Sequence, residues 1–248
     1  MKHALITGAS SGIGAALAEE FGRRGYAVGL VARRTERLEE LAEKLRAQGV
    51  TCAWAAADVT DRDATHAAFE QLEAELGPLE VMVANAGIGG QLNPLKWKHE
   101  PIRRVMEVNF FGAVHAAEAA TPGMVQRGRG TMVVISSVAA SRGLPGAGPY
   151  SASKAAIGNL WESLRVSLRP KGVRCLTINP GFIESELTDK NDFDMPFIVP
   201  AAHAAVSMVD SIEGGDRELT TPWQWVPIRW LMMGIPNWLF DWAVGPKK

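Results

Sequence analysis

The sequence predicts a single-domain α/β fold: a doubly wound parallel sheet with helices on both faces. Short apolar runs rich in β-branched residues alternate along the chain with longer segments of helical period. The strand-like runs are apolar on both faces, which is typical of parallel strands buried on both sides. The length of 248 residues fits one α/β domain, and no repeat or low-complexity linker divides the chain. We therefore expect one domain over residues 1–248.

The predicted elements follow one another as strand and helix in turn. The first three strands are "HALIT" (3–7), "AVGLVA" (27–32) and "TCAWAA" (51–56), and the helical segments after them are 13–25, 35–49 and 62–77. The alternation continues with "LEVMVANAG" (79–87), a long helical segment from Pro101 to Gln126, "TMVVISS" (131–137), a helix from Tyr150 to Leu168, and "VRCLTINPG" (173–181). In such a Rossmann-like sheet, ligands bind beyond the carboxyl ends of the strands. Residues just after each strand are therefore the candidates for a functional site.

Charge and composition argue against several other classes of protein. The chain has 26 Lys and Arg against 27 Asp and Glu, so no global basic field favours nucleic acid. Cys52 and Cys175 stand in strand-like runs without further ligands at metal-binding spacing, so we expect small buried hydrophobes and no metal site. The opening "MKHALITGASSGIG" does not resemble a secretory signal or a transit peptide. These features predict a cytoplasmic protein.

A glycine-rich turn follows the first predicted strand. In "LITGASSGIGAALA", Gly8, Gly12 and Gly14 stand between the strand and the helix. Glycine permits the conformations of a tight turn and lets backbone amides approach a pyrophosphate at the positive end of a helix. Because the spacing GxxxGxG differs from the general dinucleotide fingerprint GxGxxG, a purely structural turn is the alternative.

The end of the second predicted strand indicates which dinucleotide would bind. An acidic residue there would hydrogen-bond the adenosine ribose, whereas an arginine accommodates a 2′-phosphate. The sequence reads "GLVARRTERL", with Ala32 at the expected acidic position, followed by Arg33 and Arg34. NADP(H) is therefore favoured over NAD(H). The alternative is that both arginines only solvate the start of a helix.

Tyr150 and Lys154 are four residues apart in "GPYSASKAA", among small residues. On a helix they share one face, so both side chains would project into the crevice above the sheet. An ammonium stabilises a phenolate, so we expect Lys154 to lower the pKa of Tyr150. Tyr150 would then be a general acid for a ketone and a general base for an alcohol.

Polar and small residues at three other places support this interpretation. Ser136 and Ser137 end an apolar strand, where a hydroxyl could polarise a carbonyl oxygen. Asn109 interrupts a helical segment, and an amide at such a place usually hydrogen-bonds a nearby backbone group or a water molecule. "NAG" (85–87) closes the fourth strand with residues small enough for a ribose to lie against the backbone.

Taken together, these motifs resemble those of the classical short-chain dehydrogenase/reductase family. The matches are "TGASSGIG", "NAG", "YSASK" and "NPGFIES", in order from Leu5 to Ser185, about three quarters of the chain. The resemblance implies a catalytic tetrad of Asn109, Ser137, Tyr150 and Lys154; Ser137 is preferred to Ser136 because the family's serine lies thirteen residues before the tyrosine. In that tetrad Ser137 binds the substrate oxygen, Tyr150 transfers the proton, Lys154 lowers the tyrosine pKa and holds the nicotinamide ribose, and Asn109 anchors a relay water.

The resemblance also implies the contacts of the cofactor. The residues expected there, besides Tyr150 and Lys154, are Gly8, Ser10, Ser11, Gly12, Ile13, Gly14, Arg33, Arg34, Asp58, Val59, Asn85, Ala86, Gly87, Pro180, Gly181, Ile183 and Ser185. Ser185 stands where the family commonly has threonine. The resulting prediction is an NADP(H)-dependent oxidoreductase of the carbonyl reductase or alcohol dehydrogenase type, acting on a small carbonyl or alcohol substrate. Its alternatives are a dinucleotide-binding regulatory or assembly protein without turnover, and a membrane-surface scaffold.

The resemblance loosens after "NPGFIES". Residues 182–200 mix charges with aromatic residues and prolines, which predicts a substrate lid with a short helix. The substrate-facing candidates are Ser137, Leu144, Phe182, Phe193, Met195 and Trp97, and they favour an apolar substrate.

The last segment, 222–248, carries five of the eight tryptophans and is expected to replace the family's usual final strand. Charges and prolines interrupt it, so we do not expect a transmembrane helix. A subunit interface, a pocket wall and a peripheral membrane contact are its three interpretations. By analogy with the family, the protein is expected to be a homodimer or homotetramer.

Overall fold

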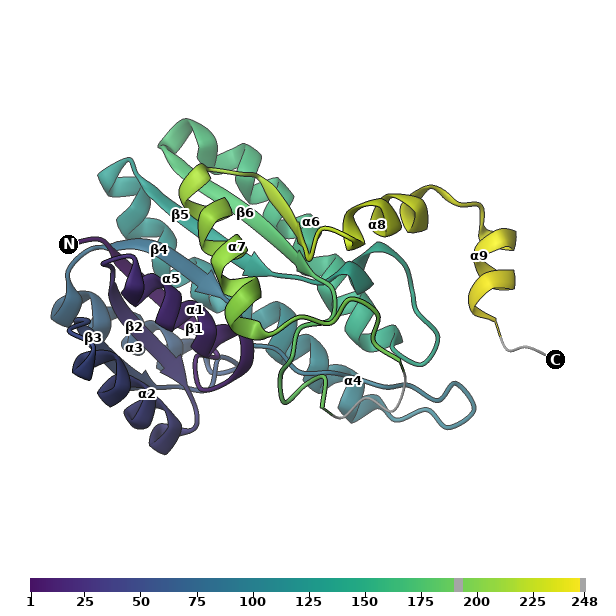
Figure 1. Cartoon of the computed structure of the whole chain (residues 1–248), viewed down its shortest axis with the longest axis horizontal. Helices are drawn as coiled ribbons and strands as arrows, with labels where there is room; N and C mark the ends of the chain where they lie inside the picture. The colour runs from purple at the N-terminus through teal and green to yellow at the C-terminus, as the bar shows by residue number, and fades with distance from the viewer. Residues whose placement is uncertain (190–193, 246–248) are drawn as a thin grey trace.

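The computed structural model describes residues 1–189 and 194–245, and within them seven strands form one parallel sheet (Figure 1). The strands are β1 (His3–Thr7), β2 (Ala27–Ala32), β3 (Cys52–Ala56), β4 (Leu79–Ala84), β5 (Gly130–Ile135), β6 (Val173–Pro180) and β7 (Glu218–Thr221). Their order is β3-β2-β1-β4-β5-β6-β7, and each neighbouring pair is parallel. The chain thus builds outward from β1 in one direction and from β4 in the other. The order reverses between β1 and β4, which is where a doubly wound sheet binds its ligand.

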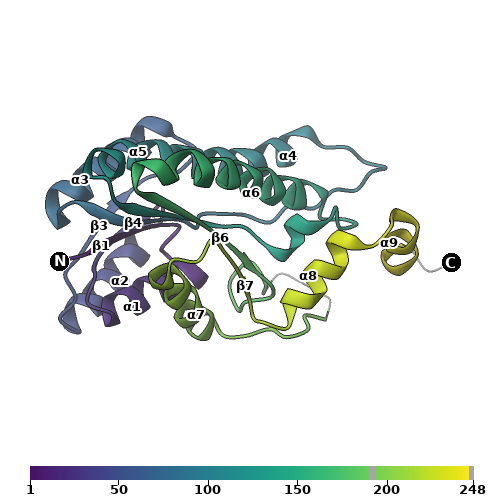
Figure 2. The same cartoon turned by 90° about the horizontal axis from the view of Figure 1, so that it is seen from above.

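Helices cover both faces of this sheet, as Figure 2 shows. The helices on one face are α1 (Gly12–Arg23), α2 (Thr35–Ala47) and α7 (Ala201–Gly214), and those on the other are α3 (Arg62–Leu76), α4 (His99–Met106), α5 (Gly112–Arg127) and α6 (Gly148–Leu168). Two apolar cores separate the helices from the sheet: Phe21, Leu38 and Met208 pack in the first, and Phe69, Met124 and Trp161 in the second. The predicted fold class is confirmed.

One prediction about the second half of the chain is wrong. A final strand is present: β7 lies just before the tryptophan-rich segment and pairs with β6 from Thr177↔Glu218 to Pro180↔Thr221. Its four residues, "ELTT", are too short and too polar to show the apolar run by which the other strands are identified. In the predicted lid, residues 186–189 and 196–197 form turns, and the part of the lid between 189 and 194 lies outside the described residues, so the short helix stays a prediction.

The tryptophan-rich segment forms two short helices after β7. They are α8 (Trp225–Gly234) and α9 (Asn237–Val244), and both views show them extending away from the rest of the chain (Figures 1 and 2). Arg142 anchors α9, because its guanidinium lies 4.4 Å from the centroid of the Phe240 ring and donates to Asn237 Oδ1 at 3.0 Å. Among the described residues, no helix combines the length and apolar character needed to cross a bilayer.

Candidate active site

The glycine-rich turn lies directly against the end of β4. Gly8 has φ +67° and Gly12 has φ +54°, conformations that favour glycine. A Cβ on Gly8 would approach Ala86 Cα to 2.7 Å, and one on Gly14 would approach the Gly8 carbonyl oxygen to 2.4 Å. The turn therefore has room for backbone only. Such a cradle at the start of α1 fits the pyrophosphate of a dinucleotide.

Asn85 fixes this cradle to the sheet. Its Nδ2 donates to the carbonyl oxygens of Thr7 at 2.9 Å and Gly8 at 3.1 Å, and its backbone N–H donates to Thr7 Oγ1 at 3.1 Å. The side-chain N–H groups of Asn85 therefore stabilise the backbone of the glycine-rich turn. The "NAG" motif has a positioning role here in addition to the cofactor contact that the resemblance implies.

The two arginines after β2 point to different partners. Arg33 Nη1 lies 3.3 Å from Asp58 Oδ2, on the β3 side of the crevice. Arg34 turns toward the glycine-rich turn, where its Nε and Nη2 donate to Ser10 Oγ at 3.1 and 3.0 Å and its Nη2 donates to Ser11 Oγ at 2.7 Å. Arg34 also forms an ion pair with Glu186, at 2.9 Å. Of the two predicted contacts to a 2′-phosphate, Arg34 is the one oriented toward the cradle.

Asp58 and Val59 follow β3, as the resemblance implies for the adenine side of the site. Burial acts to raise the pKa of Asp58, but hydrogen bonds from Thr60 and the guanidinium groups of Arg104 and Arg33 lower it to about 2. Asp58 is therefore a carboxylate at neutral pH. Val59 is buried against Gly112, so it forms part of the wall between β3 and α5.

Asn109 lies in a π-helical turn, Glu107–Phe111, between α4 and α5. The irregularity expected from the sequence is therefore present, and π-turns of this kind often mark functional sites. Asn109 Oδ1 accepts from the Ile88 N–H at 2.7 Å, and its Nδ2 donates to the Ile88 carbonyl at 2.9 Å and to Ser153 Oγ at 3.0 Å. Its amide joins three segments: the loop after β4, the π-turn and α6.

Lys154 extends from α6 to the end of β5. Its side chain is buried, and its Nζ donates to the Ile135 carbonyl oxygen at 2.7 Å. A Cβ on Gly87 would lie 3.3 Å from both Lys154 Nζ and Asn109 Oδ1, so these two polar atoms lie on the same side of the loop after β4. Burial lowers the pKa of Lys154 to about 8.

Tyr150 and Ser137 are brought together at the end of β5. Burial raises the pKa of Tyr150, and the hydrogen bond with Ser137 opposes that rise. The pKa shift therefore has the opposite direction to the one expected from Lys154, whose Nζ lies 5.9 Å from the centroid of the Tyr150 ring. Ser136 has a different hydrogen-bond partner: its Oγ donates to the backbone carbonyl of Lys154 at 2.9 Å. Of the two serines, Ser137 is the one that contacts the phenol.

The chain at the end of β6 lies at the same edge of the sheet and carries Pro180, Gly181, Ile183 and Ser185. Pro180 and Ile183 are buried, and the backbone of Ile183 forms a bridge with Val199. Ser185 lies over the glycine-rich turn, since a Cβ on Gly12 would approach its Cβ to 3.0 Å. The segment after β6 therefore reaches across to the turn that begins α1.

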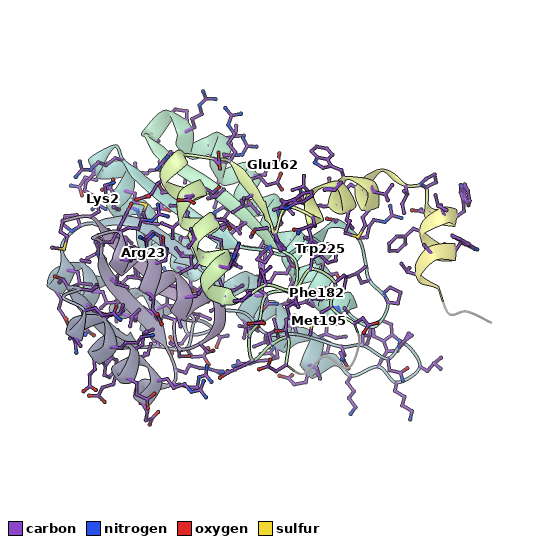
Figure 3. All side chains as sticks on the ribbon, viewed as in Figure 1. Lys2, Arg23, Glu162, Phe182, Met195 and Trp225 are labelled. Atoms are coloured by element: carbon purple, nitrogen blue, oxygen red, sulfur yellow. The ribbon has the colours of Figure 1, made fainter. Side chains whose placement is uncertain are left out.

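Trp225, the first residue of α8, packs on Gly181. A Cβ on Gly181 would come within 2.3 Å of the indole, so only glycine allows this contact. The centroid of its ring lies 5.4 Å from that of Phe182 and 6.4 Å from that of Phe197, both in edge-to-face geometry. Figure 3 shows Trp225 and Phe182 side by side. Trp225 is 9% exposed and its Nε1 has no hydrogen-bond partner among residues 1–189 and 194–245, whereas Trp223, Trp230, Trp238 and Trp242 are 67–80% exposed. One tryptophan of the tail thus belongs to the crevice, and the sequence did not distinguish it from the others.

The remaining substrate candidates differ in how far they are exposed. Leu144 and Met195 are partly buried, and Trp97 is 71% exposed on the loop before α4. Phe193 lies outside the described residues. Residues that sequence reasoning did not single out are Trp225, Glu186 and Arg37. Ser153 of "YSASK" is expected from the sequence to be a packing residue, and its hydroxyl also accepts a hydrogen bond from Asn109.

A parallel sheet of this order, a glycine cradle at its switch point and a Tyr–Lys pair on α6 define a dinucleotide-binding oxidoreductase class. The family described as short chain dehydrogenase matches residues 2–195. The chain belongs to this family.

Individual relatives agree with this assignment. An uncharacterized oxidoreductase of Myxococcus xanthus is 45% identical over 96% of this chain and 94% of its own. A short-chain dehydrogenase from Sphingobium yanoikuyae, solved with NADPH, is 29% identical with a TM-score of 0.83, covering 96% of this chain and 97% of its own. A 3-ketoacyl-(acyl-carrier-protein) reductase from Brucella melitensis, solved with NADH, is 25% identical with a TM-score of 0.82, covering 89% and 96%.

Proposed function

We propose that the protein is an NADP(H)-dependent oxidoreductase that interconverts a carbonyl compound and its alcohol, with an apolar substrate. The observation that carries the proposal is the convergence of Asn109, Ser137, Tyr150 and Lys154 beside the glycine cradle. These side chains come from the π-turn, the end of β5 and α6. The site therefore combines a phenol, an ammonium and a hydroxyl, which are the groups that proton transfer to a carbonyl oxygen requires.

The residues around the crevice fit a nicotinamide dinucleotide. The cradle of Gly8, Gly12 and Gly14 would hold its pyrophosphate, Arg34 with Ser10 and Ser11 offers donors for a 2′-phosphate, and Lys154 would hold the nicotinamide ribose. When bound, the cofactor supplies or accepts the hydride. Relatives solved with NADPH and NADH support the cofactor class, and Arg34 supports the preference for NADP(H).

Side chains of the protein would transfer the proton to and from the substrate oxygen. Tyr150 would donate it to the substrate oxygen during reduction and accept it during oxidation, and Ser137 would hold that oxygen in place. Because its pKa is raised, Tyr150 is protonated at neutral pH, the form required for reduction. Lys154, with Asn109 beside it across Gly87, would restore the proton to Tyr150 through water.

An apolar substrate is supported by the aromatic side chains at the end of β6. Phe182, Phe197 and Trp225 form one edge-to-face cluster beside Gly181. Such rings bind apolar surface and exclude water, and the indole N–H of Trp225, which has no partner in the described part of the chain, adds one polar donor.

The first experiment is a spectrophotometric screen of the purified protein. Oxidation of NADPH and, separately, of NADH is followed against apolar ketones, aldehydes and diketones, and reduction of NADP⁺ against the matching alcohols. Turnover with NADPH supports the proposal. Tight nucleotide binding without turnover of any panel member would instead favour a binding protein without catalysis.

Replacement of Arg34 tests the preference for NADP(H). We expect Arg34→Met to weaken NADPH binding by about 10- to 100-fold, because charge-assisted bonds to a phosphate contribute roughly 1.5–3 kcal/mol, and to change NADH binding by less than about threefold. Calorimetric titration with both nucleotides measures this. Arg33→Met is the matched control, since Arg33 is oriented toward Asp58, and we expect a smaller loss for NADPH. Equal losses for both nucleotides in Arg34→Met would contradict a 2′-phosphate contact.

Replacement of Trp225 tests the pocket wall. Trp225→Leu should raise KM for the largest apolar substrates by roughly tenfold, through lost aromatic contact area, with NADPH affinity within about twofold of wild type. Trp223→Leu is the control, because Trp223 is 73% exposed two positions earlier, and it should leave KM unchanged. The same change in both variants would place the substrate elsewhere.

A further inference from the structure

Glu186 forms the centre of an ion-pair network at the rim of the crevice. Its carboxylate accepts from Arg34 Nη1 at 3.1 and 2.9 Å, from Ser11 Oγ at 3.3 Å, and from Arg37 Nη1. These partners come from the glycine-rich turn and the start of α2, whereas Glu186 comes from the segment after β6. Arg34 and Glu186 are 152 residues apart in the sequence, and the ion pair between them connects their two segments.

The donors around Glu186 are of the type that recognises phosphate. Arg34 has a planar, always charged guanidinium, whose Nε and Nη2 donate to Ser10 and Ser11 and so hold it beside the glycine-rich turn. Arg37 adds a second guanidinium and Ser11 a hydroxyl. A carboxylate of this chain therefore lies on the groups that, in the proposed function, would receive the 2′-phosphate of NADP(H).

Glu186 is charged when it occupies this position. Hydrogen bonds from Arg34 lower its pKa, with Arg37 acting in the same direction. A 2′-phosphate is a second anion that would require the same Nη1 of Arg34. Two anions on one guanidinium repel each other, so the phosphate has to displace the carboxylate from Arg34, whereas the 2′-hydroxyl of NAD(H) brings no charge to this place.

We propose that Glu186 is a cofactor-specificity residue, whose carboxylate competes with the 2′-phosphate for Arg34 and so holds down the affinity for NADPH relative to NADH. The inference rests on the proposed function, because it presupposes a nicotinamide dinucleotide in the crevice. The hydrogen-bond partners of Glu186 described above, Ser11, Arg34 and Arg37, are not members of the proposed catalytic tetrad. Its effect is on the choice of nucleotide and is separate from proton transfer.

The segment that carries Glu186 is held from both sides. At its base Glu184 N donates to the Val199 carbonyl at 3.0 Å, and within it Thr188 Oγ1 donates to the carbonyl oxygens of Ile183 and Ser185, each at 2.9 Å. Ser185 also lies against Gly12. Because these contacts are independent of the carboxylate, neutralising Glu186 removes the competing charge without releasing the segment.

The test is a calorimetric binding titration of wild type, Glu186→Gln and Glu184→Gln, each with NADPH and with NADH. Gln keeps the size of Glu186 but not its charge. We expect Glu186→Gln to raise NADPH affinity roughly two- to fivefold, the upper part of the range expected for partly exposed ion pairs, and to leave NADH affinity unchanged. Glu184→Gln removes the same charge from an exposed position of the same segment and should leave both affinities within about twofold.

A second pair of probes isolates the phosphate. Adenosine 2′,5′-bisphosphate should gain affinity in Glu186→Gln by the same factor as NADPH, and adenosine 5′-monophosphate should not. An unchanged or reduced NADPH affinity in Glu186→Gln, or equal gains for NADPH and NADH, would overturn the inference while wild-type nucleotide binding leaves the proposed function standing. Failure of wild type to bind either nucleotide would overturn the proposed function itself, and the inference with it.

Discussion

Tyr150→Phe is expected to reduce turnover by roughly 10²- to 10⁴-fold, the usual contribution of a positioned general acid or base. The substitution removes only the phenolic hydroxyl, so the ring that packs near Lys154 is retained. NADPH affinity should therefore stay within about threefold of wild type. Single-turnover kinetics with a substrate from the screen, together with calorimetric titration, measure both quantities.

The chain supplies its own control for this variant. Tyr26 is the other tyrosine, and its buried ring places the hydroxyl 3.2 Å from Glu213 Oε1, away from the crevice. Tyr26→Phe should cost about 1 kcal/mol of stability through the lost hydrogen bond and leave turnover unchanged. Turnover retained in Tyr150→Phe would exclude Tyr150 as the proton donor.

Lys154→Met is expected to reduce turnover by about 10- to 1,000-fold, because the ammonium favours the phenolate form that Tyr150 must pass through. NADPH affinity should fall as well, in contrast to Tyr150→Phe, since Lys154 is proposed to hold the nicotinamide ribose. Lys171→Met, at an exposed position, is the control and should change neither quantity. A Lys154→Met enzyme with full turnover would remove Lys154 from the proposed mechanism.

The lowered pKa of Lys154 gives this variant a second, independent signature. Burial lowers the pKa to about 8, whereas in the unfolded chain it is about 10.4. Between these values the unfolded state binds more protons than the folded state, so the contribution of Lys154 to the free energy of unfolding rises with pH from about 8 to about 10.4. That rise should be missing in Lys154→Met when unfolding in urea is compared across this range. Wild-type turnover should fall as pH rises through about 8, because the ammonium is lost.

Local signals explain why so much of the first three quarters of the chain could be predicted. Strands β1 to β6 are apolar runs, and the turn after β1 requires glycine because Gly8 and Gly12 have positive φ. The spacing of Tyr150 and Lys154 follows from one helical turn. Each of these signals depends on neighbours within a few residues, so the sequence displays it directly.

The parts that were missed depend on contacts between distant segments. Strand β7 is polar and short, and it becomes a strand only because the edge of β6 is available to it. The pKa of Tyr150 rises because the folded chain buries the phenol, an effect that the spacing of Tyr150 and Lys154 does not reveal.

The sequence by itself determined the family, strands β1 to β6 and the identity of the residues proposed for catalysis, because each is encoded in a short run of residues. Only the tertiary structure decided that Arg34 and not Arg33 faces the cradle, that Trp225 alone among the tail's tryptophans packs on Gly181, and that Glu186 binds Arg34. A guanidinium or an indole can contact many partners. Which partner it meets is set by the packing of elements that are far apart in the chain. The order of residues in the sequence does not show which of these elements lie close together in space.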